Sequence, residues 1–234
     1  MPAALSPFSQ CVPCMFLSLI VNFQYLVTSF PPATAPILNR MRHAEIELKF
    51  CPGNPREFQA HAVERGFTVL TARALERNVL FDTAERTLLA QRQLLRMREY
   101  NGTWVLTHKR PPANNDDTSF YKERVETETR VDDGDAMGAV LVELGYSPAF
   151  RYEKFRTELT DGEGTLVLDE TPIGDFAELE GAPEWIDRAL ERLNVPREMC
   201  FTDSYGRMFL DWKARSDSSA ENMTFDEIAP LVAQ

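Results

Sequence analysis

The sequence predicts an α+β protein whose antiparallel β-sheet closes into a barrel. Many short alternating segments that read as strands outnumber a few short helical segments. Several of those strands also place charged residues two apart, which puts both side chains on one face. A sheet cannot pack such a face on an apolar core, whereas a barrel of about eight strands can enclose a small polar ligand. The apolar residues of the other face, such as Ile46, Leu48 and Phe155, then lie outside, where helices can cover them.

Turn residues and helix-boundary residues separate the expected strands and helices. Asn101-Gly102 is a two-residue hairpin signal between two of the strands. Pro55 near the start and Gly66 at the end delimit the first helix. Residues 86–93 fit a helix or a strand. We expect strands at residues 45–50, 78–82, 94–100, 103–109, 120–131, 149–159, 164–169 and 176–180, and helices at residues 55–66, 132–145, 183–193 and 209–215.

The first 40 residues differ from the rest of the chain, because they contain no Asp, Glu or Lys. Residues 15–30 are apolar but interrupted by Asn22 and Gln24, and a membrane span needs about 20 apolar residues. A signal peptide requires a positively charged segment before its apolar region, and none precedes residues 15–30. We therefore divide the chain into an N-terminal extension (1–40), a main domain (41–215) and a C-terminal tail (216–234). Our hypothesis is that translation starts at Met41; the alternative is a genuine hydrophobic leader.

Composition narrows the class of protein. The net charge of −11 argues against a nucleic-acid partner, because phosphate backbones require a basic surface. The interrupted apolar run argues against a membrane partner. The four cysteines are scattered, and the single Cys11-x-x-Cys14 pair is a weak metal or redox signal. We interpret the four cysteines as reduced thiols, which are typical of a cytoplasmic protein.

Charges two residues apart recur on strands along the whole chain. Some of these pairs are anionic and others cationic, which indicates one shared polar interior. Carboxylates there can hold a hard metal ion, and Lys and Arg can hold a polyanion. The pattern therefore points to phosphate chemistry. The stretches are Glu45-Ile46-Glu47-Leu48-Lys49, Arg96-Met97-Arg98, Glu126-Thr127-Glu128, Lys154-Phe155-Arg156 and Glu178-Leu179-Glu180.

This ordered set resembles the CYTH family, also called triphosphate tunnel metalloenzymes, which opens with Glu-x-Glu-x-Lys on its first strand. The resemblance covers about residues 43–212 and also includes Thr107-x-Lys109, Glu153 and Asp169. It implies a closed eight-stranded antiparallel β-barrel, the triphosphate tunnel, with helices packed outside. It further implies Mg²⁺ or Mn²⁺ as cofactor and a small triphosphate as partner: inorganic triphosphate, thiamine triphosphate or ATP. Residues 144–150 are similar to the adenylyl cyclase branch in particular.

The residues divide into three predicted roles. Hard carboxylate oxygens suit a divalent metal, and cations suit the phosphates, with Arg able to bind in a bidentate manner. Solvated strand faces and structural ion pairs are the alternatives for these groups. If the strand register differs, Glu123 faces inward in place of Glu126 and Glu128. The metal candidates are Glu45, Glu47, Asp169, Glu178 and Glu180; the phosphate candidates are Lys49, Arg96, Arg98, Lys109, Lys154 and Arg156; the catalytic candidates are Glu126, Glu128 and Lys154.

Three functions fit these residues. The first is metal-dependent hydrolysis of an inorganic or organic triphosphate. The second is a class IV adenylyl cyclase, which makes cyclic AMP and pyrophosphate from ATP. The third is a module that binds polyphosphate without turning it over, and the complete set of metal candidates argues against it. No Gly-x-x-x-x-Gly-Lys-Ser/Thr phosphate loop or dinucleotide-binding fingerprint is present.

Overall fold

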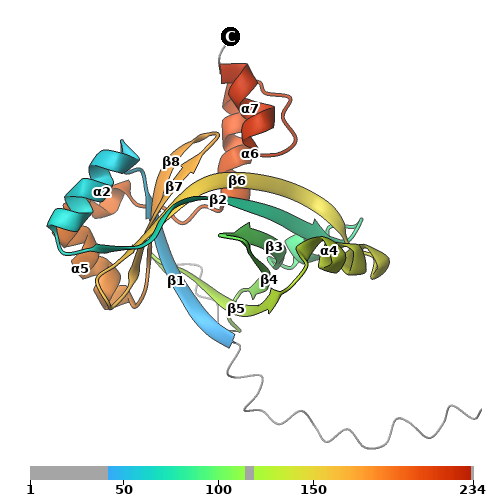
Figure 1. The fold of residues 1–234 in the computed structure, drawn as a ribbon, viewed down its shortest axis with the longest axis horizontal. Helices are drawn as coiled ribbons and strands as arrows, with labels where there is room; N and C mark the ends of the chain where they lie inside the picture. Colours follow the sequence, from blue (N-terminus) through green and yellow to red (C-terminus); the bar gives the residue numbers. More distant parts are fainter. Residues whose placement is uncertain (1–41, 114–118, 233–234) are drawn as a thin grey trace, which may run out of the picture. The chain divides into compact units, whose positions relative to one another are not determined.

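The protein folds around a closed antiparallel barrel of eight strands (Figure 1). The computed structural model describes residues 42–113 and 119–232, so the predictions for residues 1–40 lie outside the described part. Neighbouring strands follow the order β1-β5-β4-β3-β2-β6-β7-β8. The predicted fold class is confirmed. The strands are β1 (Arg42–Phe50), β2 (Thr68–Asp82), β3 (Leu94–Tyr100), β4 (Thr103–Arg110), β5 (Lys122–Val131), β6 (Ser147–Thr160), β7 (Thr165–Thr171) and β8 (Gly174–Glu180).

Several helices begin at a residue whose side chain accepts hydrogen bonds from the first backbone N–H groups. Asn54 accepts hydrogen bonds from the backbone nitrogens of Arg56 and Glu57, and Asp133 accepts one from Ala136. The helices are α2 (Pro55–Glu64), α3 (Thr87–Ala90), α4 (Gly134–Glu143), α5 (Pro183–Leu193), α6 (Tyr205–Ser216) and α7 (Phe225–Val232), with a 3₁₀ turn η2 (Arg197–Met199).

The segment at residues 86–93, which fits a helix or a strand by sequence, contains the single-turn helix α3. The carboxylate of Asp82, at the end of β2, accepts hydrogen bonds from the backbone nitrogens of Leu88 and Leu89 at 2.9 and 3.0 Å. These bonds anchor the turn to the barrel, because they satisfy N–H groups that a short helix leaves unpaired.

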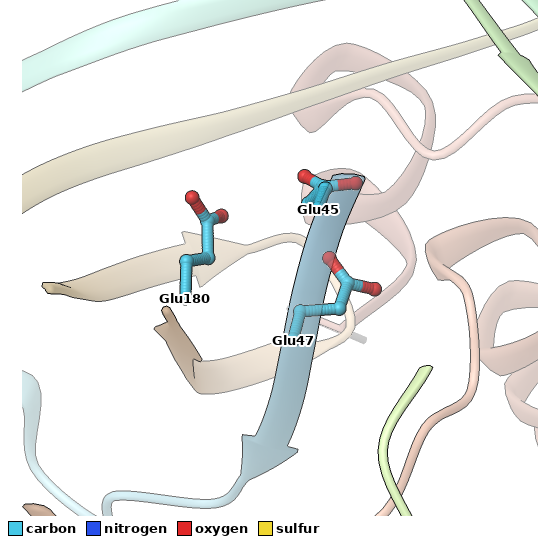
Figure 2. Close-up of side chains that lie close together, drawn as sticks. All are labelled: Glu45, Glu47 and Glu180. Atoms are coloured by element: carbon cyan, nitrogen blue, oxygen red, sulfur yellow. The ribbon is translucent and has the colours of Figure 1, made fainter. Parts of the chain in front are cut away.

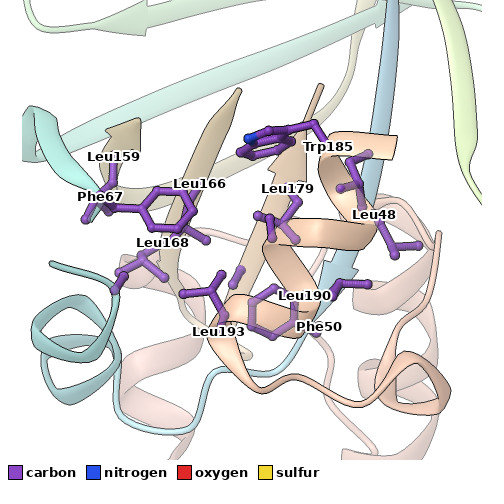
Figure 3. Close-up of a cluster of buried hydrophobic side chains, with 14 residues drawn as sticks. Leu48, Phe50, Phe67, Leu159, Leu166, Leu168, Leu179, Trp185, Leu190 and Leu193 are labelled. Carbon is purple, nitrogen blue, oxygen red and sulfur yellow. The ribbon is translucent and has the colours of Figure 1, made fainter. Parts of the chain in front are cut away.

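The largest apolar core lies on the outer face of the barrel, as the sequence predicts. Leu48 of β1, Leu166 of β7 and Leu179 of β8 are completely buried there, and α5 packs on them with Trp185 and Ile186 (Figure 3). Burying each large apolar side chain stabilises the fold by about 1.5–3 kcal/mol. Helix α5 therefore covers this part of the barrel from outside.

The strand predicted at residues 78–82 is much longer in the structure. β2 has 15 residues and starts at Thr68. It pairs with β6 along its whole length but with β3 only between Glu76 and Phe81. Register shifts next to Thr71 interrupt the pairing with β6. Bulges break the two-residue alternation, so the first half of β2 shows no strand pattern in the sequence.

The end of the chain packs against the inner side of the sheet. Helix α6 starts four residues earlier than predicted, with Ser204 accepting a hydrogen bond from the Arg207 nitrogen. Its Tyr205 and Phe209 form an apolar cluster with Tyr152 of β6. The segment predicted as a tail contains α7, and its Ile228 is completely buried. Among the residues described, no helix is long and apolar enough to cross a membrane.

Candidate functional site

The strand register gathers the predicted charges on the inner face of the barrel. Glu47 of β1 lies opposite Lys122 on one side and Glu180 on the other. Lys49 lies opposite Glu178, and Lys109 of β4 lies opposite Glu126 of β5. Since residues two apart share a face, these pairs fix the whole polar set in one interior.

Three carboxylates meet at one place in this interior. Glu45 and Glu47 on β1 and Glu180 on β8 each offer an oxygen, and these oxygens lie within 4.8 Å of one another (Figure 2). Oxygen donors from several carboxylates fit a hard divalent cation such as Mg²⁺ or Mn²⁺. The residues present therefore suit the metal that the resemblance implies.

The three carboxyl groups have different pKa values. Burial, reinforced by the negative charge of Glu178, raises the pKa of Glu180 to about 8. Burial also raises the pKa of Glu45. Burial pushes the pKa of Glu47 in the same direction, but the positive charges of Lys49 and Lys122 lower it below the ordinary value. The cluster thus combines one firmly ionised carboxylate with groups that hold protons more readily.

A second group of charges lies deeper among β6, β7 and β8. The Lys154 ammonium donates to Asp169 at 2.9 Å. The Arg156 guanidinium donates to Asp169 at 2.7 and 2.8 Å and to Glu178 at 3.1 Å. All four side chains are buried. Two predicted metal candidates, Asp169 and Glu178, are therefore paired with predicted phosphate-binding cations.

The third group joins β3, β4 and β5. Lys109 forms ion pairs with Glu126 and, at 2.7 Å, with Glu45, and so connects this group to the acidic cluster. Arg96 lies 3.8 Å from Glu128. Glu126 is 4% exposed whereas Glu123 is exposed to solvent. The register thus selects Glu126 and Glu128 as the inward residues, as favoured in the sequence analysis. Arg98 shares their face, because it lies two residues from Arg96.

The interior also contains residues that the sequence analysis did not assign to the site. Glu76 of β2 is completely buried beside Lys154. Lys122 forms an ion pair with Glu47. The hydroxyl of Tyr205, which the sequence places in a segment that plugs or lines the tunnel, donates to Asp169 at 2.5 Å. The alternation of β5 marks Lys122 as inward, whereas Glu76 lies before the strand predicted at residues 78–82.

The barrel interior contains acidic groups that suit a metal ion and basic groups that suit a polyanion. The profile of the CYTH domain family matches residues 43–193, so this chain belongs to the CYTH family. The chain is also 23% identical over 172 residues to a protein of Methanocaldococcus jannaschii named "putative adenylate cyclase", covering 69% of this chain and 95% of that protein.

Solved structures share the fold. A protein of Vibrio parahaemolyticus, described as a "putative adenylate cyclase", is 22% identical with a TM-score of 0.61, covering 71% of this chain and 97% of the other. A protein of Pyrococcus horikoshii is 25% identical with a TM-score of 0.59, covering 71% of this chain and 98% of the other. Both likenesses extend over almost the whole of those proteins.

Proposed function

We propose that this protein is a metal-dependent enzyme that hydrolyses a small triphosphate inside the barrel. The observation that supports this most strongly is the combination of three converging carboxylates with buried Lys and Arg side chains on one inner face. A triphosphate carries about four negative charges at neutral pH, and several cations are needed to offset them. A binding module has no need of the carboxylate cluster.

Each group of the interior has a role in this proposal. Glu45, Glu47 and Glu180 would hold Mg²⁺ or Mn²⁺, with Asp169 and Glu178 as further ligands once substrate occupies the cations that they now pair with. When bound, the metal would offset the charge that develops on the transferred phosphoryl group. The phosphates would be bound by Lys49, Arg96, Arg98, Lys109, Lys154 and Arg156.

The catalytic residues of the proposal are Glu126, Glu128 and Lys154. Glu126 is buried, and its positive neighbours Lys109 and Arg96 outweigh burial and lower its pKa below the ordinary value. It is therefore an ionised carboxylate at neutral pH, able to orient water and to accept a hydrogen bond from it. Glu128 accepts a hydrogen bond from Thr107 at 2.7 Å, which fixes its direction. Lys154 would hold a phosphate oxygen as charge builds up on it.

A class IV adenylyl cyclase is the second candidate. It is favoured by the name of the Methanocaldococcus relative. A related fold from Hippeastrum, 19% identical with a TM-score of 0.51, is described as a putative adenylyl cyclase with a dominant triphosphatase activity. The triphosphatase activity described for that protein supports the hydrolase as the first candidate here. A polyphosphate-binding module is the third candidate.

One experiment separates these candidates. The full chain is incubated with Mg²⁺ or Mn²⁺ and with ATP, inorganic triphosphate or thiamine triphosphate, and the products are identified. Free phosphate supports the hydrolase, cyclic AMP with pyrophosphate supports the cyclase, and tight binding without products supports the module. Excess chelator should abolish turnover, and full activity in chelator would contradict the proposal.

A matched pair of variants assigns the activity to the barrel interior. Glu45→Gln keeps the side-chain volume and removes one charge from the acidic cluster, so turnover should almost disappear. Glu170→Gln removes the same charge from the outer surface, where Glu170 pairs with Arg73, and should leave turnover unchanged. Equal activity of the two variants would place the reaction elsewhere.

A further inference from the structure

Glu76 lies among the cations to which the proposed function assigns the phosphates. It is completely buried. Its Oε1 lies 3.5 Å from the Lys154 ammonium, and its Oε2 lies 3.7 Å from Nε of Arg156. The Asn78 side-chain nitrogen donates to Oε1 at 2.9 Å. The carboxylate is therefore held on one side by a neutral amide and faces two cations on the other.

This part of the interior has unused hydrogen-bonding capacity of both kinds. Two acceptors are buried without a hydrogen-bond partner among the described residues: Oε2 of Glu76 and Oδ1 of Asn78. Two donors, Nε of Arg96 and Nε of Arg98, are buried in the same way. Such orphaned groups are costly in a folded protein. Unpaired donors on β3 and the cations on β6 flank β2 on its two sides, and together they fit an anion.

Glu76 is charged in this environment. Burial pushes its pKa upward, but the positive charges of Lys154, Arg156, Arg96 and Arg98 outweigh burial and hold the pKa well below the ordinary value. A phosphate that enters would therefore meet a fixed negative charge close to its own binding groups. Like charges at such short range repel one another, and the repulsion is stronger in a buried site than in water.

We propose that Glu76 is a built-in counter-anion: it holds Lys154 and Arg156 in position in the empty tunnel and competes with phosphate for them. Substrate and product then bind less tightly than these cations alone would allow, which favours product release. Glu76 is a positioning residue in this scheme. The inference rests on the proposed function, since it assumes that the same cations bind phosphates.

The test is calorimetric binding of inorganic triphosphate and of pyrophosphate to the full chain in excess chelator, where no metal-dependent turnover occurs. Glu76→Gln should bind both anions about tenfold more tightly than the wild type, a difference of about 1.4 kcal/mol. A residue that only supported the fold would weaken binding when changed. Glu170→Gln, which removes a charge outside the barrel, is the matched control and should bind as the wild type does.

A second variant keeps the test decisive if Glu76→Gln does not fold. The double variant Glu76→Gln/Asn78→Asp moves the carboxylate two residues along the same face and keeps one acid and one amide. It should fold and bind both anions with wild-type affinity, because the counter-charge is restored. An unfolded double variant, or a folded Glu76→Gln with unchanged or weaker binding, overturns the inference. A wild type that binds neither anion, with or without Mg²⁺, overturns the proposed function as well.

Discussion

Glu180 should release a proton when a divalent metal binds to the acidic cluster. Glu180 is the cross-strand partner of Glu47, and one of its carboxyl oxygens lies within 4.8 Å of an oxygen of Glu45 and one of Glu47. Burial and the neighbouring charge of Glu178 raise its pKa to about 8. At pH 7 most of the molecules therefore carry a proton on Glu180, and a metal ligand must give that proton up.

The same shift makes the metal-free protein less stable as the pH rises. The folded state holds this proton between the ordinary pKa of 4.5 and about 8, whereas the unfolded state has already lost it. The stabilisation is present in full below pH 4.5 and disappears as the pH approaches 8. Since one pKa unit corresponds to about 1.36 kcal/mol, the contribution of Glu180 is on the order of 4–5 kcal/mol.

Calorimetry in buffers of different ionisation enthalpy measures this proton directly. Titration of Mg²⁺ or Mn²⁺ at pH 7 should release clearly more protons per metal from the wild type than from Glu180→Gln. The metal-free Glu180→Gln variant should also lose less stability than the wild type between pH 5 and pH 8 in urea unfolding. Equal proton release from the wild type and from Glu180→Gln would refute the reasoning.

Three further predictions concern other parts of the molecule. Arg96→Ala should weaken triphosphate binding about ten- to a hundredfold in calorimetry, whereas Arg77→Ala, at an exposed side chain, should not. Tyr205→Phe removes a donor to Asp169 and should lower the unfolding free energy in urea by about 1–3 kcal/mol; no loss would mean that α6 does not need this bond. Asp161 bonds to Trp185, and burial pushes its pKa up while Trp185, Arg192 and backbone N–H groups bring it down to about 2. Asp161→Asn should therefore cost on the order of 2 kcal/mol at pH 7, and the cost should vanish as the pH falls from about 4 to 2, because the stabilisation exists only above the unfolded pKa; a difference that persists in acid would contradict this.

The barrel interior was predictable wherever local alternation is intact. Glu45, Glu47 and Lys49 are separated by large apolar residues, and side chains two apart share a face whatever the rest of the fold does. The same rule identified Arg96 and the choice of Glu126 over Glu123. For these positions the local sequence determines which side faces the interior. The apolar face of the strand must be buried against helices, whereas the charged face cannot be.

Only the tertiary structure decided which side chains from distant strands and helices come into contact. Glu180 reaches Glu47 because β8 closes on β1 in one particular register, and no spacing in the sequence states that distance. Glu76 was missed because the predicted strand begins at residue 78, whereas β2 begins at Thr68 and its bulges near Thr71 hide the strand pattern of its first half. Tyr205 contacts Asp169 only because α6 packs against the inner side of β6. The sequence alone therefore determined the chemistry of the interior, whereas the closure of the barrel decided which charges meet, since long-range pairing depends on the whole set of strands.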